Sequence, residues 1–266
     1  MKNVLKRTKA IALGFMYVAI YYVVSVITQL VYYISQRRGA VLGSDIEANL
    51  RDSSFALYVI AAIISIWIYM IIGKFRGKPL YVVIEERNVP QIIYLMSVCM
   101  AFGARFLVTV YYHYSQNIEV LKKSIDAAAA VSPKLSTPTQ LLAAVLSIVV
   151  AAPFFEEVLF RGIVMNEFKS VMRPWAANAL QSVVFGMAHA VLYQSIFAAV
   201  LGFILGVIYQ RTHNIRTTII CHSVFNFSVI LTQTQMSAVT VGIFMAFGSL
   251  LVLCPMVYIL LTCKNK

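Results

Sequence analysis

Long apolar runs, separated by short polar segments, follow one another along this whole sequence. A helix needs about 20 apolar residues to cross a bilayer, and eight runs approach that length. They predict spanning helices at 11–34, 55–73, 91–112, 141–162, 175–192, 194–210, 218–235 and 240–262. The sizeable loops are 35–54 and 114–140, and the second should hold a short amphipathic helix followed by a flexible lead-in. No tandem repeat is visible, so we expect one all-α, polytopic membrane domain over residues 1–266.

Composition excludes an ordinary soluble protein, because 61% of the 266 residues are hydrophobic, 12% are charged and the mean hydropathy is +0.81. The net charge of +12 does not indicate a nucleic-acid partner, since the basic residues form short clusters between apolar runs, as in cytoplasmic loops. Most of the 22 Lys and Arg fall inside if both termini are cytoplasmic. The four cysteines show no paired spacing and are expected to be small buried hydrophobes.

Glu156 and Glu157 are the acidic residues that lie within an apolar stretch, where each uncompensated charge costs at least about 2.5–3.5 kcal/mol. Glu157 precedes Arg161 by four residues, the favourable order for a helical ion pair. That pair could simply hold helices together. Glu156 has no obvious local counter-charge, which suits a general base.

Two histidines also lie in apolar segments. His222 and Asn226 are four residues apart and share a helix face. A hairpin about residues 173–174 would bring His189 level with Glu156. His222, however, is close to a cytoplasmic loop and His189 to an outer turn. Either the turn near 193 dips into the membrane, or segment 162–172 lies along the cytoplasmic surface. Each histidine alone could be a simple interhelical hydrogen-bonding group.

These residues form three ordered motifs over 141–235, namely Glu-Glu-x-x-x-Arg from Glu156, Phe-x-x-x-His ending at His189, and His-x-x-x-Asn from His222 to Asn226. Together they resemble the signatures of the CAAX protease and bacteriocin-processing (CPBP, or Abi) family of intramembrane proteases. The resemblance implies eight helices around an intramembrane polar cavity. It also implies an endopeptidase of a bacterial cell membrane that hydrolyses a membrane-proximal or lipid-embedded peptide.

The resemblance further assigns roles to these side chains. Glu156 and His189 would activate water, His222 and Asn226 would stabilise the oxyanion, and the pair of Glu157 and Arg161 would orient the site. A metalloendopeptidase is the other form of the hypothesis, since Glu156, His189 and His222 could ligate Zn²⁺ with water in the fourth position. No His-Glu-x-x-His motif is present, and we favour the metal-free form.

Other readings of the sequence compete with a peptidase. A non-catalytic scaffold or a bacteriocin self-immunity protein could use the same fold, and a small carrier could also use intramembrane Glu and His residues. Arg105 is expected to neutralise a glutamate across the bundle, or to bind a lipid headgroup or a substrate carboxylate. The tyrosine pairs at 21–22, 32–33 and 111–112 are expected in an interfacial belt or the core.

Overall fold

In the computed structural model, residues 2–39, 53–79, 86–131, 137–231 and 237–263 are described, and helices account for nearly all of them. One isolated bridge, between Glu86 and Asn214, is the β-structure recorded in these ranges. The helices are α1 Lys2–Gly39, α3 Ser54–Phe75, α5 Gln91–Ser115, α6 Glu119–Val131, α7 Pro138–Ala144, the π-helix η1 Val145–Ala151, α8 Ala152–Glu157, the π-helix η2 Val158–Val164, α9 Met165–Lys169, α10 Pro174–Met187, α11 Leu192–Thr212, α12 Ile215–Leu231 and α13 Ala238–Thr262. The elements from α7 to α9 run on as one helix, here called the central helix (Pro138–Lys169).

The predicted all-α, polytopic membrane fold is confirmed, and each of the eight predicted ranges contains a helix. Six helices within the described ranges are long and apolar enough to cross a membrane. The other two, α10 and α12, have 14 and 17 residues. The number of eight spans therefore stays a prediction. The amphipathic helix expected within 114–140 is confirmed as α6, and the lead-in at 132–136 lies outside the described residues.

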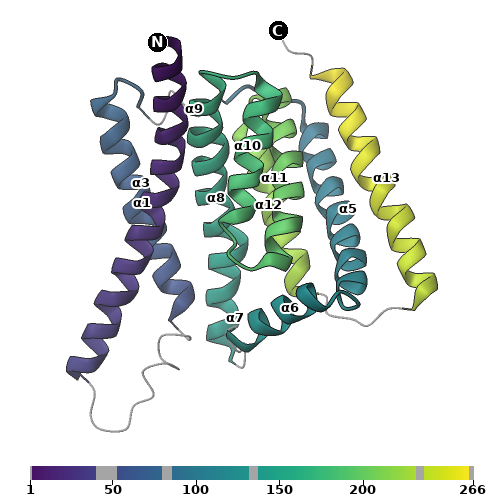
Figure 1. Cartoon of the computed structure of the whole chain (residues 1–266). Coiled ribbons are helices and arrows are strands. Elements are labelled where there is room, and N and C mark those ends of the chain that lie inside the picture. Colours follow the sequence, from purple (N-terminus) through teal and green to yellow (C-terminus); the bar gives the residue numbers. More distant parts are fainter. Residues whose placement is uncertain (1, 40–52, 80–85, 132–136, 232–236, 264–266) are drawn as a thin grey trace.

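The helices form a bundle in which the first two and the last one lie at opposite sides (Figure 1). Helices α1 and α3 pack on one side of the central helix, and α5 and α13 pack together on the other side of the bundle. Helix α6 crosses the lower end in Figure 1, where Ser124 accepts a hydrogen bond from the Tyr193 amide at 3.1 Å. The start of α1 and the end of α13 lie at the same end of the bundle (Figure 1), as an even number of crossings requires.

Two apolar cores flank the middle of the bundle. One joins α1, α3, the central helix and α10, with Phe155 and Phe168 almost fully buried. The other joins α5, α11, α12 and α13 around residues such as Leu205 and Ile208. The polar residues singled out in the sequence lie where the two cores meet.

Helices α10 and α11 form a close pair because small residues let their backbones approach, as is common between membrane helices. Gly202 and Gly206 on α11 form a Gly-x-x-x-Gly pattern facing α10. A Cβ atom at Gly206 would lie 1.8 Å from Oδ1 of Asn178, and one at Gly202 would lie 2.9 Å from the Phe185 ring. This close packing fixes the position of Phe185, which touches both histidines of the motifs.

The turn after α10 explains how His189 and His222 reach one depth. With 14 residues, α10 is about 21 Å long at about 1.5 Å per residue, less than the hydrocarbon thickness of about 30 Å. The turn at 188–191 therefore lies inside the bundle, above α6 in Figure 1. The alternative, a surface segment at 162–172, is wrong, because the central helix continues to Lys169. The apolar residues at 163–165 and Phe168 bury that continuation in the core.

Candidate active site

The two adjacent glutamates lie on α8, between the two π-helical segments of the central helix. A π-helical turn uses i→i+5 hydrogen bonds and is frequent at functional sites. In η1 the amide of Ala152 accordingly donates to the Ser147 carbonyl. The next amide in this register belongs to Pro153, which has no N–H, so the Ile148 carbonyl is left without that donor. The side chain of Asn226 on α12 supplies one, with Nδ2 2.8 Å from the Ile148 oxygen.

The hydrogen bond to the Ile148 carbonyl also fixes the position of the Asn226 side chain. A primary amide carries two N–H donors, and the bond to Ile148 uses one of them. Asn226 also lines the larger cavity described below. One amide N–H therefore anchors the side chain beside the cavity, and the amide carries a second N–H donor.

Glu157 is fully buried, and one of its oxygens accepts from two side chains. Oε1 lies 2.7 Å from Nη1 of Arg161 and 2.9 Å from Nδ1 of His222. Arg161, also fully buried, donates through Nη2 to the Gly202 carbonyl at 3.0 Å, and its guanidinium lies 4.7 Å above the Phe185 ring. These contacts offset part of the desolvation of the two buried charges, while Oε2 of Glu157 and Nε of Arg161 are buried without a hydrogen-bond partner in the described part of the chain. The expected partner of Glu157 was Arg161, and the contact with His222 adds a link to the motif on α12.

The bond to Glu157 also decides what His222 can do. A carboxylate oxygen only accepts, so Nδ1 of His222 carries the proton in that bond. In the neutral ring Nε2 then has a free lone pair, and it lies 3.8 Å from Oε2 of Glu156, too far for a direct hydrogen bond. Neutral His222 is therefore a base or a ligand at Nε2, and it donates there only as an imidazolium.

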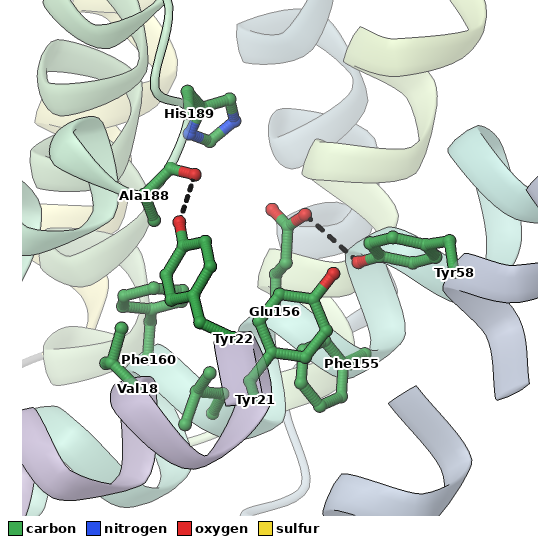
Figure 2. Close-up of a pocket in the computed structure, with 10 residues that line it drawn as sticks. Val18, Tyr21, Tyr22, Tyr58, Phe155, Glu156, Phe160, Ala188 and His189 are labelled. Atoms are coloured by element: carbon green, nitrogen blue, oxygen red, sulfur yellow. Dashed lines mark hydrogen bonds between the residues drawn. The ribbon is translucent and has the colours of Figure 1, made fainter. Parts of the chain in front are cut away.

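Glu156 is in a more open setting than its neighbour. Its side chain is 19% exposed, and Oε1 accepts a hydrogen bond from the Tyr58 phenol on α3 at 3.2 Å. Figure 2 shows this carboxylate among tyrosines, with Tyr21 and Tyr22 of α1 on one side and Tyr58 on the other. The carboxylate faces a space instead of a cation.

His189 lies in the turn after α10, where the backbone is bent sharply. Ala190 has a φ of +57°, and the Val191 amide donates to the His189 carbonyl at 2.6 Å. Together these make a γ-turn of the rare, strained kind, which persists only where the surroundings hold it. The His189 ring donates from Nδ1 to the Phe185 carbonyl at 2.9 Å, since a carbonyl only accepts. Its Nε2 therefore also carries a lone pair when the ring is neutral.

Glu156, His189 and Tyr58 line two cavities. The smaller, about 100 Å³, is closed on one side by the tyrosines of α1 (Figure 2). The larger, about 460 Å³, also reaches His222 and Asn226. Its remaining wall is mainly apolar and includes Phe55, Ile148, Ala152, Phe197, Leu201, Phe225 and Val229. The polar groups thus gather in a chamber that is otherwise suited to apolar side chains.

The structure brings Glu156, His189, His222 and Asn226 to this one chamber, and places Glu157 and Arg161 behind it. Their catalytic roles stay predictions. The sequence motifs do not identify Tyr58 as part of this site. For Tyr22 the sequence predicts only a place in an interfacial belt or the core. The signal available for Tyr22 was the Tyr21-Tyr22 pair within an apolar run; for Tyr58 the sequence offers none, because lone tyrosines are common in such runs.

The donor types of Glu156, His189 and His222 suit Zn²⁺, but their arrangement does not form a ligand set. Throughout the described ranges, no three His, Cys, Asp or Glu side chains lie close enough together to hold a metal ion. In this geometry the three residues do not fit a metal centre.

Comparison with known proteins supports the motif assignment over one segment. Residues 138–228 match the family described as "Type II CAAX prenyl endopeptidase Rce1-like". The chain is 30% identical over 86 residues to the Bacillus subtilis (strain 168) protein named "Putative membrane peptidase YdiL". That match spans 32% of this chain and 35% of the relative. No solved structure matches the chain significantly.

Proposed function

Through residues 138–228 the chain belongs to the CAAX protease and bacteriocin-processing family, and we propose that it is an intramembrane endopeptidase. The proposal is carried by one observation, the convergence of Glu156, His189, His222 and Asn226 on one mainly apolar chamber. The substrate would be a peptide in or beside the bilayer. Its apolar residues would occupy the chamber while its scissile carbonyl meets the polar end.

Glu156 is the proposed general base. Its carboxylate has a hydrogen-bond donor in Tyr58 and faces the gap shared with His189 (Figure 2). A water in that gap would give a proton to Glu156, aided by the Nε2 lone pair of His189, and its oxygen would attack the peptide carbonyl carbon. The base would then return the proton to the departing nitrogen as the C–N bond breaks, which leaves a carboxylic acid and an amine.

Stabilisation of the oxyanion is the proposed role of Asn226 and His222. The free amide N–H of Asn226 can donate at once, because its second N–H is anchored on Ile148. His222 can donate only when Nε2 is protonated. An imidazolium at this place would lie between Glu157, at 2.9 Å, and Glu156, at 3.8 Å.

The test is cleavage of a library of membrane-embedded peptides by the purified protein in lipid nanodiscs, followed by mass spectrometry. We expect Glu156→Gln to lower kcat by about 10²–10⁴-fold, the usual contribution of a general base. The matched control is Glu119→Gln on α6, which removes an exposed carboxylate paired with Lys123. It should cleave like the wild type.

Two results would contradict the proposal. The first is a folded wild-type protein that cleaves no peptide of the library. The second is Glu156→Gln protein that supports the cellular function fully, since this change keeps the shape of the side chain and removes the base. Either result would favour the non-catalytic scaffold or self-immunity protein.

A further inference from the structure

The family match begins at residue 138, yet the groups that hold Glu156 and the His189 turn include residues of the first two helices. Tyr58 of α3 donates to the Glu156 carboxylate. Tyr22 of α1 donates to the carbonyl of Ala188, the residue before His189. Figure 2 shows the Tyr22 phenol bonded to Ala188 beside His189, and the Tyr58 phenol bonded to Glu156 from the other side of the carboxylate.

We propose that α1 and α3 complete the active site by supplying two positioning residues, Tyr58 for the Glu156 carboxylate and Tyr22 for the turn that carries His189. This inference rests on the proposed peptidase function and deepens it. Neither tyrosine belongs to the three motifs.

Packing around Phe155 aligns these helices with Glu156. Phe155 directly precedes the glutamate and is 1% exposed. Its ring centroid lies 4.7 Å from that of Tyr21 and 6.4 Å from those of Tyr58 and Tyr69. A residue wedged between α1 and α3 in this way fixes how α8 turns its next residue toward Tyr58. The contact between Tyr58 and Glu156 is therefore supported by apolar packing on the same helices.

The His189 turn needs such external support. Its γ-turn at Ala190 is strained, and strained backbone persists only where neighbouring groups hold it. Tyr22 of α1 bonds to the turn itself, and Ser124 of α6 accepts from the Tyr193 amide at the start of α11, just after the turn. Of these two supports, Tyr22 is the one that lines the cavity containing Glu156.

Tyr58→Phe and Tyr22→Phe test the proposal, because each change removes a single oxygen. The matched control is Tyr69→Phe, also on α3, whose phenol donates to the Tyr17 carbonyl at 2.7 Å. In the peptide assay we expect Tyr58→Phe to lower kcat about ten-fold or more with KM unchanged, since it loses a hydrogen bond to a charged group. Tyr22→Phe should lower kcat less. Tyr69→Phe should keep the wild-type kcat and lose only thermal stability.

A double-mutant cycle gives a readout that does not need activity. If Tyr58 acts on Glu156, the fall in melting temperature caused by Tyr58→Phe should be smaller in a Glu156→Leu background than in the wild type. If Tyr58→Phe lowers the melting temperature equally in both backgrounds, Tyr58 does not act on Glu156 and the inference is wrong.

The outcomes separate this inference from the proposed function. Cleavage by the wild type and equally by Tyr58→Phe would overturn the inference alone, as would an equal loss of kcat in Tyr58→Phe and Tyr69→Phe. If neither the wild type nor Tyr69→Phe cleaves any peptide, the proposed function fails and this inference fails with it.

Discussion

Glu156 and Glu157 are neighbours in the chain but belong to two different regions of the molecule. Glu157 faces a closed side, where Arg161, His222 and the α10–α11 pair surround it and no part of the side chain is exposed. Glu156 faces an open side, formed by two cavities and the tyrosines of α1 and α3. The closed side has the ion pair and the close helix packing, so its groups are fixed. The open side leaves a carboxylate and two imidazole lone pairs available for a substrate.

One helix, α8, thus carries a buried, paired carboxylate at Glu157 and a carboxylate that lines the cavities at Glu156, directly before it. A step of one residue turns the side chain by about 100° around the helix, enough to move it from one side to the other. If this division is correct, substitutions on the closed side should cost stability, and those on the open side should chiefly change activity.

The largest effect on stability should follow from Arg161→Met. It removes the cation of Glu157 and leaves a fully buried carboxylate without its counter-charge, so we expect a loss of about 3–5 kcal/mol in the free energy of unfolding. Unfolding in detergent measures it. Lys123→Met is the matched control, because Lys123 and Glu119 form the same i,i+4 pair on the surface, 74% and 79% exposed. If Arg161→Met and Lys123→Met lower the free energy of unfolding by equally small amounts, the buried ion pair does not stabilise the closed side more than a surface pair does.

A moderate effect should follow from Gly206→Ala, also on the closed side. The added Cβ would overlap Oδ1 of Asn178, so either the Asn178 side chain must leave its hydrogen bonds to Gln181 and the Phe203 carbonyl or α11 must move away from α10, at a cost of about 1–3 kcal/mol. Thermal melting in detergent is the measurement. Gly242→Ala on α13 is the control, since a Cβ there meets nothing within 4 Å. A Gly206→Ala protein as stable as the wild type would show that the closed side is loosely packed.

A smaller effect on stability is expected where α1, α3 and α9 meet, away from both cavities. Arg76, just after α3, donates to both oxygens of Glu167 on α9, at 2.7 and 3.1 Å, and to the Tyr17 phenol at 3.0 Å. These hydrogen bonds, chiefly those to Glu167, raise the pKa of the Arg76 guanidinium above its usual range. The contacts join α1 and α3 to the end of the central helix.

We expect Arg76→Gln to destabilise the fold by about 1 kcal/mol, because a partly exposed pair is screened by water. Lys78→Gln is the control, since Lys78 is 53% exposed and lies 4.0 Å from Glu167. Thermal melting at low and high salt compares the two. A loss for Arg76→Gln as large as that for Arg161→Met would contradict the division into a closed and an open side.

The sequence predicts much of the fold because a bilayer imposes a length and an apolar composition on each helix. One inaccurate boundary is that of α10, which ends at Met187 instead of 192. Residues 188–191 are mainly apolar, so hydropathy does not distinguish them from the spanning helix before them. The sharp turn at Ala190 is held by contacts that α1 and α6 make on either side of it, and such contacts between distant helices leave no trace in the hydropathy of the sequence.

The site is predictable where its residues are unusual. A glutamate or histidine is conspicuous in an apolar run, so Glu156, His189 and His222 could be found, and the resemblance that the three motifs carry implied a polar cavity. Tyr58 could not, because its role depends on a contact with Glu156 across 98 positions of sequence. The hydrogen bond from His222 to Glu157 likewise depends on how α8 and α12 pack.

The smallest effect we expect is that of metal removal, and it tests whether the open side acts by itself. Since the described residues hold no cluster suited to a metal, and Glu156 can act as the base, prolonged chelation should leave the cleavage rate unchanged. Metal analysis of the purified protein should then find no stoichiometric zinc. The contrary result would be activity that chelation abolishes and Zn²⁺ restores, with bound zinc that is lost in His189→Ala and His222→Ala. Glu156 and the two Nε2 atoms would then have to approach one another around the ion, and the open side would be a ligand set that closes on its metal.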